Sequence, residues 1–223
     1  QALCLVSAKE EAALVSPAAP IVLMRRRGEG VAEEVAPGVA ELGIMLPCSP
    51  LHHLLAALVE RPLVCTSGNL SEEPICITPS EALHRLSGVV DLFLVHDRPI
   101  VRPLDDSVTR VVDGRPQLIR RARGYVPRPI PLGREVPPVL ALGGHLKSTV
   151  ALSRRSEAIV SQHLGDLESA ETRDLLRRSV EDLIAFFDAR PVAIACDLHP
   201  DYASTHLAEA LASQHGLPVI RVQ

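Results

Sequence analysis

The sequence predicts an α/β protein, and the clearest evidence lies in its last third. Short apolar runs separated by turn residues over 139–163 predict a β-meander, and alternating helix and strand patterns follow to residue 223. A second observation is the strand-like pattern of residues 96–125. A third is an apolar content of 47%, which is enough for a core. Only 2% of the residues are aromatic, so aliphatic side chains must build that core.

The first half of the chain predicts short helices and strands. Residues 1–14 are typical of a helix and residues 20–27 of a strand. Ser49 and Pro50 predict the start of a further helix, with serine as N-cap and proline in the first turn. His52 and His53 follow at about 100° to each other on that helix, so we expect one packed and one exposed histidine, with no shared metal ion.

The apolar run at residues 63–65 predicts a buried strand, and residues 89–95 predict a further strand. Between them, Thr78 and Glu81 predict a capping box that opens a helix. The strand at 63–65 ends in a polar turn, Thr66-Ser67-Gly68-Asn69. Its hydroxyl and backbone N–H groups can point at an anion, although the pattern is also that of an ordinary turn.

Residues 96–125 hold seven arginines and four aspartates among apolar residues. Such a stretch can form strands whose charges pair across a sheet at under about 1 kcal/mol each. It can equally form an anion site, because guanidinium groups bind phosphate or carboxylate oxygens bidentately. In that case Asp105 and Asp106 would hold Mg²⁺ or orient the arginines, and a nucleotide or acyl phosphate is the leading ligand class.

Residues 126–138 contain five prolines and predict a linker between two domains. Beyond it we expect strands at 139–142, 147–153 and 158–163, a helix at 168–189, a strand at 192–197, a helix at 202–215 and a last strand at 218–222. Gly143, Gly144 and Lys147 suit a phosphate loop, although Gly-Gly is also a good hairpin turn. Asp197 ends a strand at the edge where such sheets bind ligands.

Composition excludes several classes of function. The net charge of −4 argues against a general nucleic-acid or anionic-membrane binder. The five cysteines include no C-x-x-C pair, so we expect neither a zinc ribbon nor a disulfide framework, and a reducing cytoplasm fits best. No long apolar run predicts a membrane span, and the first residues of the sequence do not have the pattern expected of a signal peptide. Both ends of the chain have the pattern of interrupted elements, and we expect a fragment.

Six segments carry a resemblance to a known family. They are TSGNLSEEPI, HDRPIVRPLDDSVTRV, RRARGYVPRPI, LGGHLK, SQHLGDLESAET and DLHPDYAST, in this order. The chain resembles the HypF carbamoyltransferases, which mature NiFe hydrogenases. The resemblance implies a YrdC-like twisted sheet with helices over residues 1–125, the proline-rich linker at 126–138, and the opening of an ASKHA-type transferase domain over 139–223.

The resemblance also implies site residues. It matches Ser67 and Asn69 to a phosphate-binding turn, and Gly143, Gly144 and Lys147 to the phosphate loop of the second domain. Catalytic roles would fall to Arg102, Asp106, Arg121 and Arg123. The cofactor-binding residues would be Thr66, Ser67, Asn69, Ser107, Gly143, Gly144, Lys147, His163, Asp166 and Asp197.

The chemistry implied by the family has two steps. Carbamate from carbamoyl phosphate reacts with ATP and Mg²⁺ to give carbamoyl-adenylate, and the carbamoyl group then passes to the C-terminal cysteine of HypE and becomes a cyanide ligand. No nucleic-acid or membrane partner is expected, despite a double-stranded-RNA label in the YrdC family. The family's zinc fingers and metal-binding histidines have no match here, so we expect no metal ligands, weak or absent nucleotide binding, and no turnover by this chain alone.

Two alternatives stay open. One is a threonylcarbamoyl-adenylate synthase that supplies tRNA modification, although such synthases do not continue into LGGHLK. The other is a non-enzymatic module that binds a nucleotide or a partner protein and leaves the arginine-lined cleft without chemistry.

Overall fold

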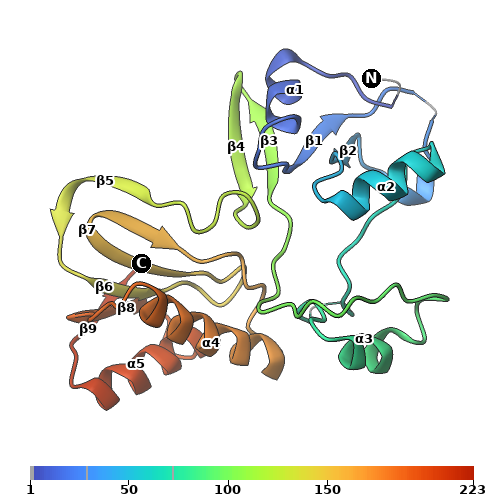
Figure 1. Ribbon diagram of the computed structural model, residues 1–223. Coiled ribbons are helices and arrows are strands. Elements are labelled where there is room, and N and C mark those ends of the chain that lie inside the picture. The colour runs from blue at the N-terminus through green and yellow to red at the C-terminus, as the bar shows by residue number, and fades with distance from the viewer. Residues whose placement is uncertain (1–2, 29, 72) are drawn as a thin grey trace. The chain divides into compact units, whose positions relative to one another are not determined.

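The computed structural model describes residues 3–28, 30–71 and 73–223. The chain divides into two compact units, one of residues 1–66 and 106–125, the other of residues 67–105 and 126–223. We call them the first and second unit (Figure 1) and describe each by itself. No helix in the described ranges is long and apolar enough to span a membrane.

The first unit is built on a four-stranded sheet with the order β2-β1-β3-β4. The strands are β1 (Ile21–Arg25), β2 (Glu41–Ile44), β3 (Val108–Val112) and β4 (Arg115–Arg120). β1 runs parallel to β3, and the other two pairs are antiparallel. Val22 and Met24 alternate inward from β1 and pack with Leu42 and Ala13 in the core, as the period of two in a half-buried strand requires.

Helix α2 (Pro50–Val59) begins at the Ser49 cap that the sequence predicts, whereas helix α1 (Ala8–Leu14) begins at Ser7, for which no cap was predicted. Ser7 and Glu10 form a reciprocal capping box at α1, so this helix starts later than residue 1. Ser49 accepts a hydrogen bond from His52 N at α2. The expectation of one packed histidine is wrong, because His52 and His53 are both exposed and no residue of α2 is buried. A short 3₁₀ helix, η1 (Glu33–Val35), precedes β2.

The two strands expected at residues 63–65 and 89–95 do not form. Val64 is 76% exposed and Leu92 is 90% exposed. An apolar run becomes a strand only where another strand offers it a paired edge, and in the described chain neither segment is paired with one. Between them lies α3 (Pro79–Leu86), whose Thr78 cap is as expected. The Glu81 carboxylate accepts from Ile77 N instead of the cap residue's own N–H.

The second unit contains a five-stranded sheet with the order β5-β7-β6-β8-β9. These strands are β5 (Ile130–Val136), β6 (Val139–Leu142), β7 (Val150–Val160), β8 (Ala193–Asp197) and β9 (Val219–Val222). Strand β6 is antiparallel to β7 and parallel to β8, and β8 is parallel to β9. Figure 1 shows α4 (Ala170–Phe186) and α5 (Ala203–His215) beside this sheet. The predicted α/β class is confirmed.

The core of the second unit joins the sheet to both helices. Leu140, Leu152 and Ile194 of the strands and Leu176 of α4 are almost completely buried. The amphipathic helix predicted over 168–189 is confirmed as α4, and Leu175, Leu176, Val180 and Leu183 of its apolar face are buried. Gly216 ends α5 in the left-handed conformation, as its sequence position predicts.

Two expectations for the start of the second unit need correction. The proline-rich segment is not wholly a spacer, because residues 130–136 form β5, an edge strand that pairs with β7. An edge strand tolerates prolines, because the side of the strand that faces solvent does not have to donate backbone hydrogen bonds to another strand. The expected break at Arg154 and Arg155 is absent. Strand β7 runs through both residues, with Arg155 at φ 55° where the β5 register shifts. The domain boundaries drawn from the sequence stay a prediction.

Gly124 should be the most sensitive glycine of the first unit. Its φ is +84°, and an added Cβ would lie 2.3 Å from the Ala18 carbonyl oxygen. We expect Gly124→Ala to lower the free energy of unfolding by about 3 kcal/mol, from backbone strain and the backbone clash together. Gly114, in the Asp113-Gly114 turn of the β3–β4 hairpin, has φ +71° with open space around it, so Gly114→Ala should cost only about 1 kcal/mol. Equal losses in denaturant unfolding would contradict the close approach.

Candidate functional site

A buried polar cluster lies where β3 begins in the first unit. Ser107 is fully buried; its hydroxyl donates to Arg123 O at 2.9 Å and accepts from Ala122 N at 2.8 Å. Its carbonyl accepts from Ile21 N at 2.8 Å. Ser107 therefore fastens the segment after β4 to the start of β3. This is a structural use of a residue that we expected to touch a cofactor.

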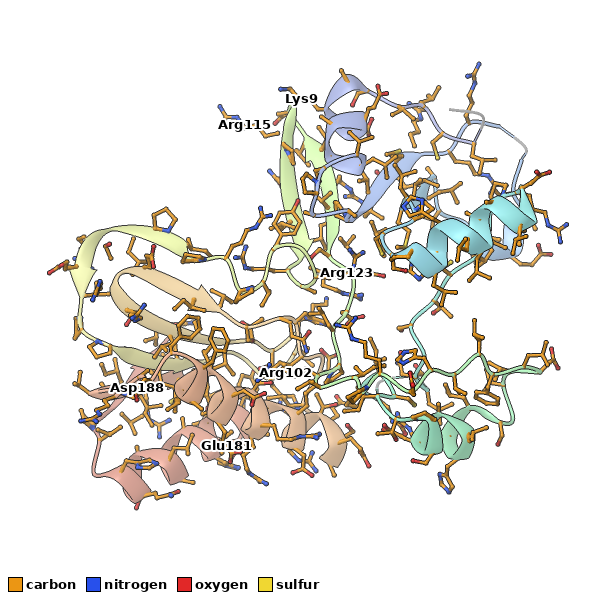
Figure 2. The ribbon with its side chains drawn as sticks, viewed as in Figure 1. Lys9, Arg102, Arg115, Arg123, Glu181 and Asp188 are labelled. Carbon is orange, nitrogen blue, oxygen red and sulfur yellow. The ribbon has the colours of Figure 1, made fainter. Side chains whose placement is uncertain are left out.

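Arg123 extends the same cluster (Figure 2). Its Nε and Nη2 atoms lie 2.7 and 2.6 Å from Asp106 Oδ1, and Nη2 also donates to Ala19 O at 3.0 Å. Asp106 was expected either to hold Mg²⁺ or to orient an arginine, and these distances are those of a carboxylate that orients an arginine. Most N–H groups of Arg123 are thus engaged by the protein, and its contacts hold residues 18–19 against Asp106. Catalytic roles for Asp106 and Arg123 stay predictions.

The other arginines of residues 96–125 lie in different settings. Arg110 of β3 pairs with Glu41 of β2 across the first-unit sheet, which is the ion-pair alternative weighed from the sequence. Arg121 donates from Nη2 to Tyr125 O at 2.9 Å. It directly precedes Ala122, whose N–H donates to the Ser107 hydroxyl. Arg110 therefore pairs across the sheet and Arg121 anchors a loop, while the structure gathers Asp106, Ser107 and Arg123 in one cluster that does not include Arg110.

Arg102 belongs to the second unit and is bound there. Its Nε atom lies 2.5 Å from Asp182 Oδ2 on α4. The residue after Arg102 is also held, because the side-chain amide of Gln162 donates a hydrogen bond to the Pro103 carbonyl. The hydrogen bond from Arg102 holds the pKa of Asp182 below its usual value. Residues 101–104 thereby line a mostly apolar hollow of about 330 Å³ with Leu183 and other residues of α4. Asp182 was not predicted as the partner of Arg102, because the two residues are 80 positions apart in the chain.

The Ser67 turn is formed as predicted, but without a strand before it. Asn69 N donates to Ser67 O at 3.1 Å, and Cys76 N donates to Gly68 O at 2.9 Å. The Asn69 amide nitrogen donates to Leu70 O, while its side-chain oxygen is buried with no protein partner in the described residues. Thr66 and Ser67 are exposed. Contacts of Thr66, Ser67 and Asn69 with a cofactor stay predictions.

The loop between β6 and β7 is the second candidate site. Gly143 N donates to Thr149 O at 2.9 Å, and a Cβ on Gly143 would lie 2.9 Å from that same oxygen. Only glycine fits this close approach. The loop spans residues 143–149, so the pair of glycines is not a two-residue hairpin turn. Of the two interpretations of the glycine pair, the simple hairpin turn is wrong.

Residues 164–167 hold this loop from the other side. Lys147, at φ +49°, donates its backbone N–H to Asp166 Oδ1 at 2.7 Å. Ser148 N donates to Gly165 O, and Leu167 N donates to His145 O, each at 2.9 Å. Asp166 thus positions the loop through its carboxylate, while the side chain of Lys147 stays exposed. His163, half-buried, precedes this segment.

Asp197 ends β8 where the sequence places it, on the neighbouring strand to β6. Its Oδ1 atom accepts from His199 N at 2.8 Å. The His199 ring stacks on Tyr202 at 4.2 Å between centroids, and Tyr202 stacks on His145 of the β6–β7 loop at 5.4 Å. The sequence analysis missed this three-ring stack. The rings come from two loops, and no spacing rule in the sequence connects them.

All five cysteines are free thiols in the structure. Cys4 and Cys196 are buried, and burial raises the pKa of both thiols. Neither therefore suits nucleophilic chemistry. Within the described ranges, no three His, Cys, Asp or Glu side chains group as a metal site.

Comparisons with known proteins now decide the family. A family model described as "Telomere recombination", of the YrdC type, matches residues 1–122, and one described as "HypF Kae1-like domain" matches residues 134–223. The chain belongs to the HypF carbamoyltransferase family. The HypF of Synechocystis is 49% identical over 94% of this chain and 27% of its own length. The HypF of Rhodobacter capsulatus is 48% identical over 98% of this chain and 30% of its own length.

Two solved HypF structures cover the whole chain. One, a full-length HypF in the phosphate- and nucleotide-bound form, has a TM-score of 0.94 at 42% identity, and the match covers 35% of it. The HypF of T. kodakarensis has a TM-score of 0.96 at 32% identity, and the match covers 29% of it. The chain thus spans about a third or less of these HypF proteins, and the resemblance found in the sequence is confirmed.

The ion pair between Arg102 and Asp182 should contribute measurably to stability. Both side chains are about half exposed, so a double-mutant cycle with Arg102→Ala and Asp182→Asn should give a coupling of about 0.5–1 kcal/mol at pH 7. The pKa of Asp182 is lowered in the folded state. The coupling should therefore be complete above the unfolded-state value, about 3.9, and be lost as the pH falls through the lower folded-state pKa.

The matched control is Arg177 and Asp174 on the same helix, 3.2 Å apart and more exposed. Their cycle should give about 0.3 kcal/mol. If the two cycles give the same coupling, or if the Arg102 cycle does not change with pH, residues 101–104 are not anchored on α4 by this pair.

Proposed function

We propose that this chain is part of a carbamoyltransferase that activates carbamate with ATP and transfers the carbamoyl group to a protein thiol in hydrogenase maturation. The supporting observation is the match of the whole chain to a HypF that was solved with phosphate and nucleotide bound. Both of this chain's candidate sites resemble phosphate-handling segments of that family.

The proposed reaction balances in two steps. Carbamate derived from carbamoyl phosphate attacks the α-phosphorus of ATP, pyrophosphate leaves, and carbamoyl-adenylate forms. The thiol of the C-terminal cysteine of HypE then attacks the carbamoyl carbon, AMP leaves, and the thiol proton is released. HypE, the hydrogenase role and the cyanide ligand are proposals for the family protein, of which this chain spans about a third or less.

In this proposal the β6–β7 loop binds phosphate oxygens of a nucleotide. Gly143 and Gly144 let an anion approach the backbone closely, and the exposed Lys147 side chain supplies positive charge. Asp166 fixes the backbone of Lys147 from behind. Asp197 and His163 lie on adjoining segments and would contact the ligand or order water around it.

In the first unit, Arg121 is the proposed arginine for the charge that develops as pyrophosphate leaves. Ser107, Asp106 and Arg123 would serve as its frame, since their contacts fix the segment on which it lies. Arg102, Thr66, Ser67 and Asn69 stay proposed contacts of the adenylation chemistry. Mg²⁺ would arrive with the ATP phosphates, because the described residues offer no ready-made metal site.

The sharpest test uses the only two lysines of the chain, Lys9 and Lys147. We expect isothermal titration with ATP and Mg²⁺ to detect binding, and Lys147→Ala to weaken it about tenfold through loss of a charge at the phosphates. Lys9→Ala removes the same charge from α1 in the other unit and should leave the affinity unchanged. No binding by the unmodified chain, or equal effects of the two substitutions, would overturn the proposal.

A second experiment separates an enzyme from a docking module. The assay uses an active protein that contains this chain and measures AMP and pyrophosphate formed from carbamoyl phosphate, ATP and Mg²⁺. Arg121→Ala should abolish the formation of both products. Asp106→Asn, which loosens the same frame without removing Arg121, should retain part of the activity. If Arg121→Ala, with or without Arg123→Ala, leaves nucleotide binding intact, the arginines are better assigned to a protein partner.

A further inference from the structure

Three rings connect the two loops that carry the predicted ligand contacts of the second unit. His145 belongs to the β6–β7 loop, whereas His199 and Tyr202 follow β8. Tyr202 lies between the imidazoles, with interplanar angles of 26° to His145 and 8° to His199. The phenol ring is therefore a spacer between the loop of Lys147 and the loop of Asp197.

Both ends of the stack are fixed to site residues. On one side, His145 O accepts from Leu167 N, in the segment whose Asp166 holds Lys147. On the other side, His199 N donates to Asp197 Oδ1 and His199 O accepts from Thr205 Oγ1. These hydrogen bonds join the β6–β7 loop to residues 166–167 and the loop after β8 to Asp197 and Thr205. The ring stack joins the β6–β7 loop to the loop after β8.

The position of Tyr202 supports a use beyond local structure. It is the N-cap residue of α5, where serine, threonine, aspartate and asparagine are preferred, and it makes no side-chain cap hydrogen bond. Capping thus gives no reason for a tyrosine here. Its ring is half-buried between two histidines, where an aromatic face adds stabilisation of a defined geometry.

We propose that Tyr202 is a positioning residue that sets the β6–β7 loop at a fixed separation from Asp197 and so prepares the loop to bind the phosphates of a nucleotide. The proposal rests on the proposed function for the identity of the ligand. The positioning itself is a property of the protein without ligand. Tyr202 touches no reacting atom in this account and acts through His145 and the backbone of residues 145–148.

The test is amide hydrogen exchange of the whole chain without ligand, followed by titration with ATP and Mg²⁺. Tyr202→Ala should raise the exchange rates of the Lys147, Ser148 and Leu167 amides by about tenfold, because their hydrogen bonds open more often once the spacer is gone. Tyr202→Phe keeps the aromatic ring, so the same three amides should exchange as slowly as in the unmodified chain. The His206 amide, bonded to Tyr202 O in the first turn of α5, reports whether the helix stays folded.

His145→Ala provides a second route if Tyr202→Ala does not fold, since it removes the other end of the stack from a half-buried loop position. The same three amides should exchange faster in this variant. ATP affinity should fall about fivefold in both alanine variants and recover in Tyr202→Phe.

The outcomes separate the two proposals. Faster exchange in the alanine variants supports the positioning role even if the unmodified chain binds no ATP, and in that case only the nucleotide function falls. Unchanged exchange in Tyr202→Ala and His145→Ala overturns the positioning role, whether or not ATP binds. An equal loss of affinity in Tyr202→Phe and Tyr202→Ala also overturns it, because the hydroxyl and not the ring would then matter.

Discussion

The hydrogen bonds between residues 145–148 and 165–167 are the constraint on which the candidate site of the second unit depends. The Asp166 carboxylate accepts a hydrogen bond from the N–H of Lys147. Two backbone hydrogen bonds, from Leu167 N to His145 O and from Ser148 N to Gly165 O, fix the residues on its two sides. A loop bound in this way keeps its shape without a ligand, which lowers the entropy cost of binding an anion. Gly143 allows the close approach to Thr149 that starts the loop.

The sequence predicted most of the elements in residues 139–223 because the signals there are local. The apolar face of α4, the Gly216 cap and the position of Asp197 at the end of β8 all follow from periodicity and end chemistry, and all are present. The first half of the chain was harder. The apolar runs at 63–65 and 89–95 satisfy every local rule for strands, yet pairing is a long-range property, and they are not paired in the structure.

The charged residues show a similar limit. Seven arginines predicted an ionic face, but the sequence could not tell that Arg110 pairs with Glu41, Arg123 with Asp106, and Arg102 with Asp182. These partners are between 17 and 80 residues apart. The His145–Tyr202–His199 stack is of the same kind, because two separate loops supply it. Family membership, by contrast, followed from short ordered segments and is confirmed by the comparisons.

In the proposed function, the β6–β7 loop, held by residues 164–167, binds the phosphates of a nucleotide. Amide NMR spectra of the chain, recorded as ATP and Mg²⁺ are added, observe this loop itself. We expect the amide signals of Gly143, Gly144 and Lys147 to shift progressively and saturate, while those of the Asp113-Gly114 hairpin turn stay in place. Saturating shifts elsewhere that leave residues 143–148 unchanged would overturn the proposal.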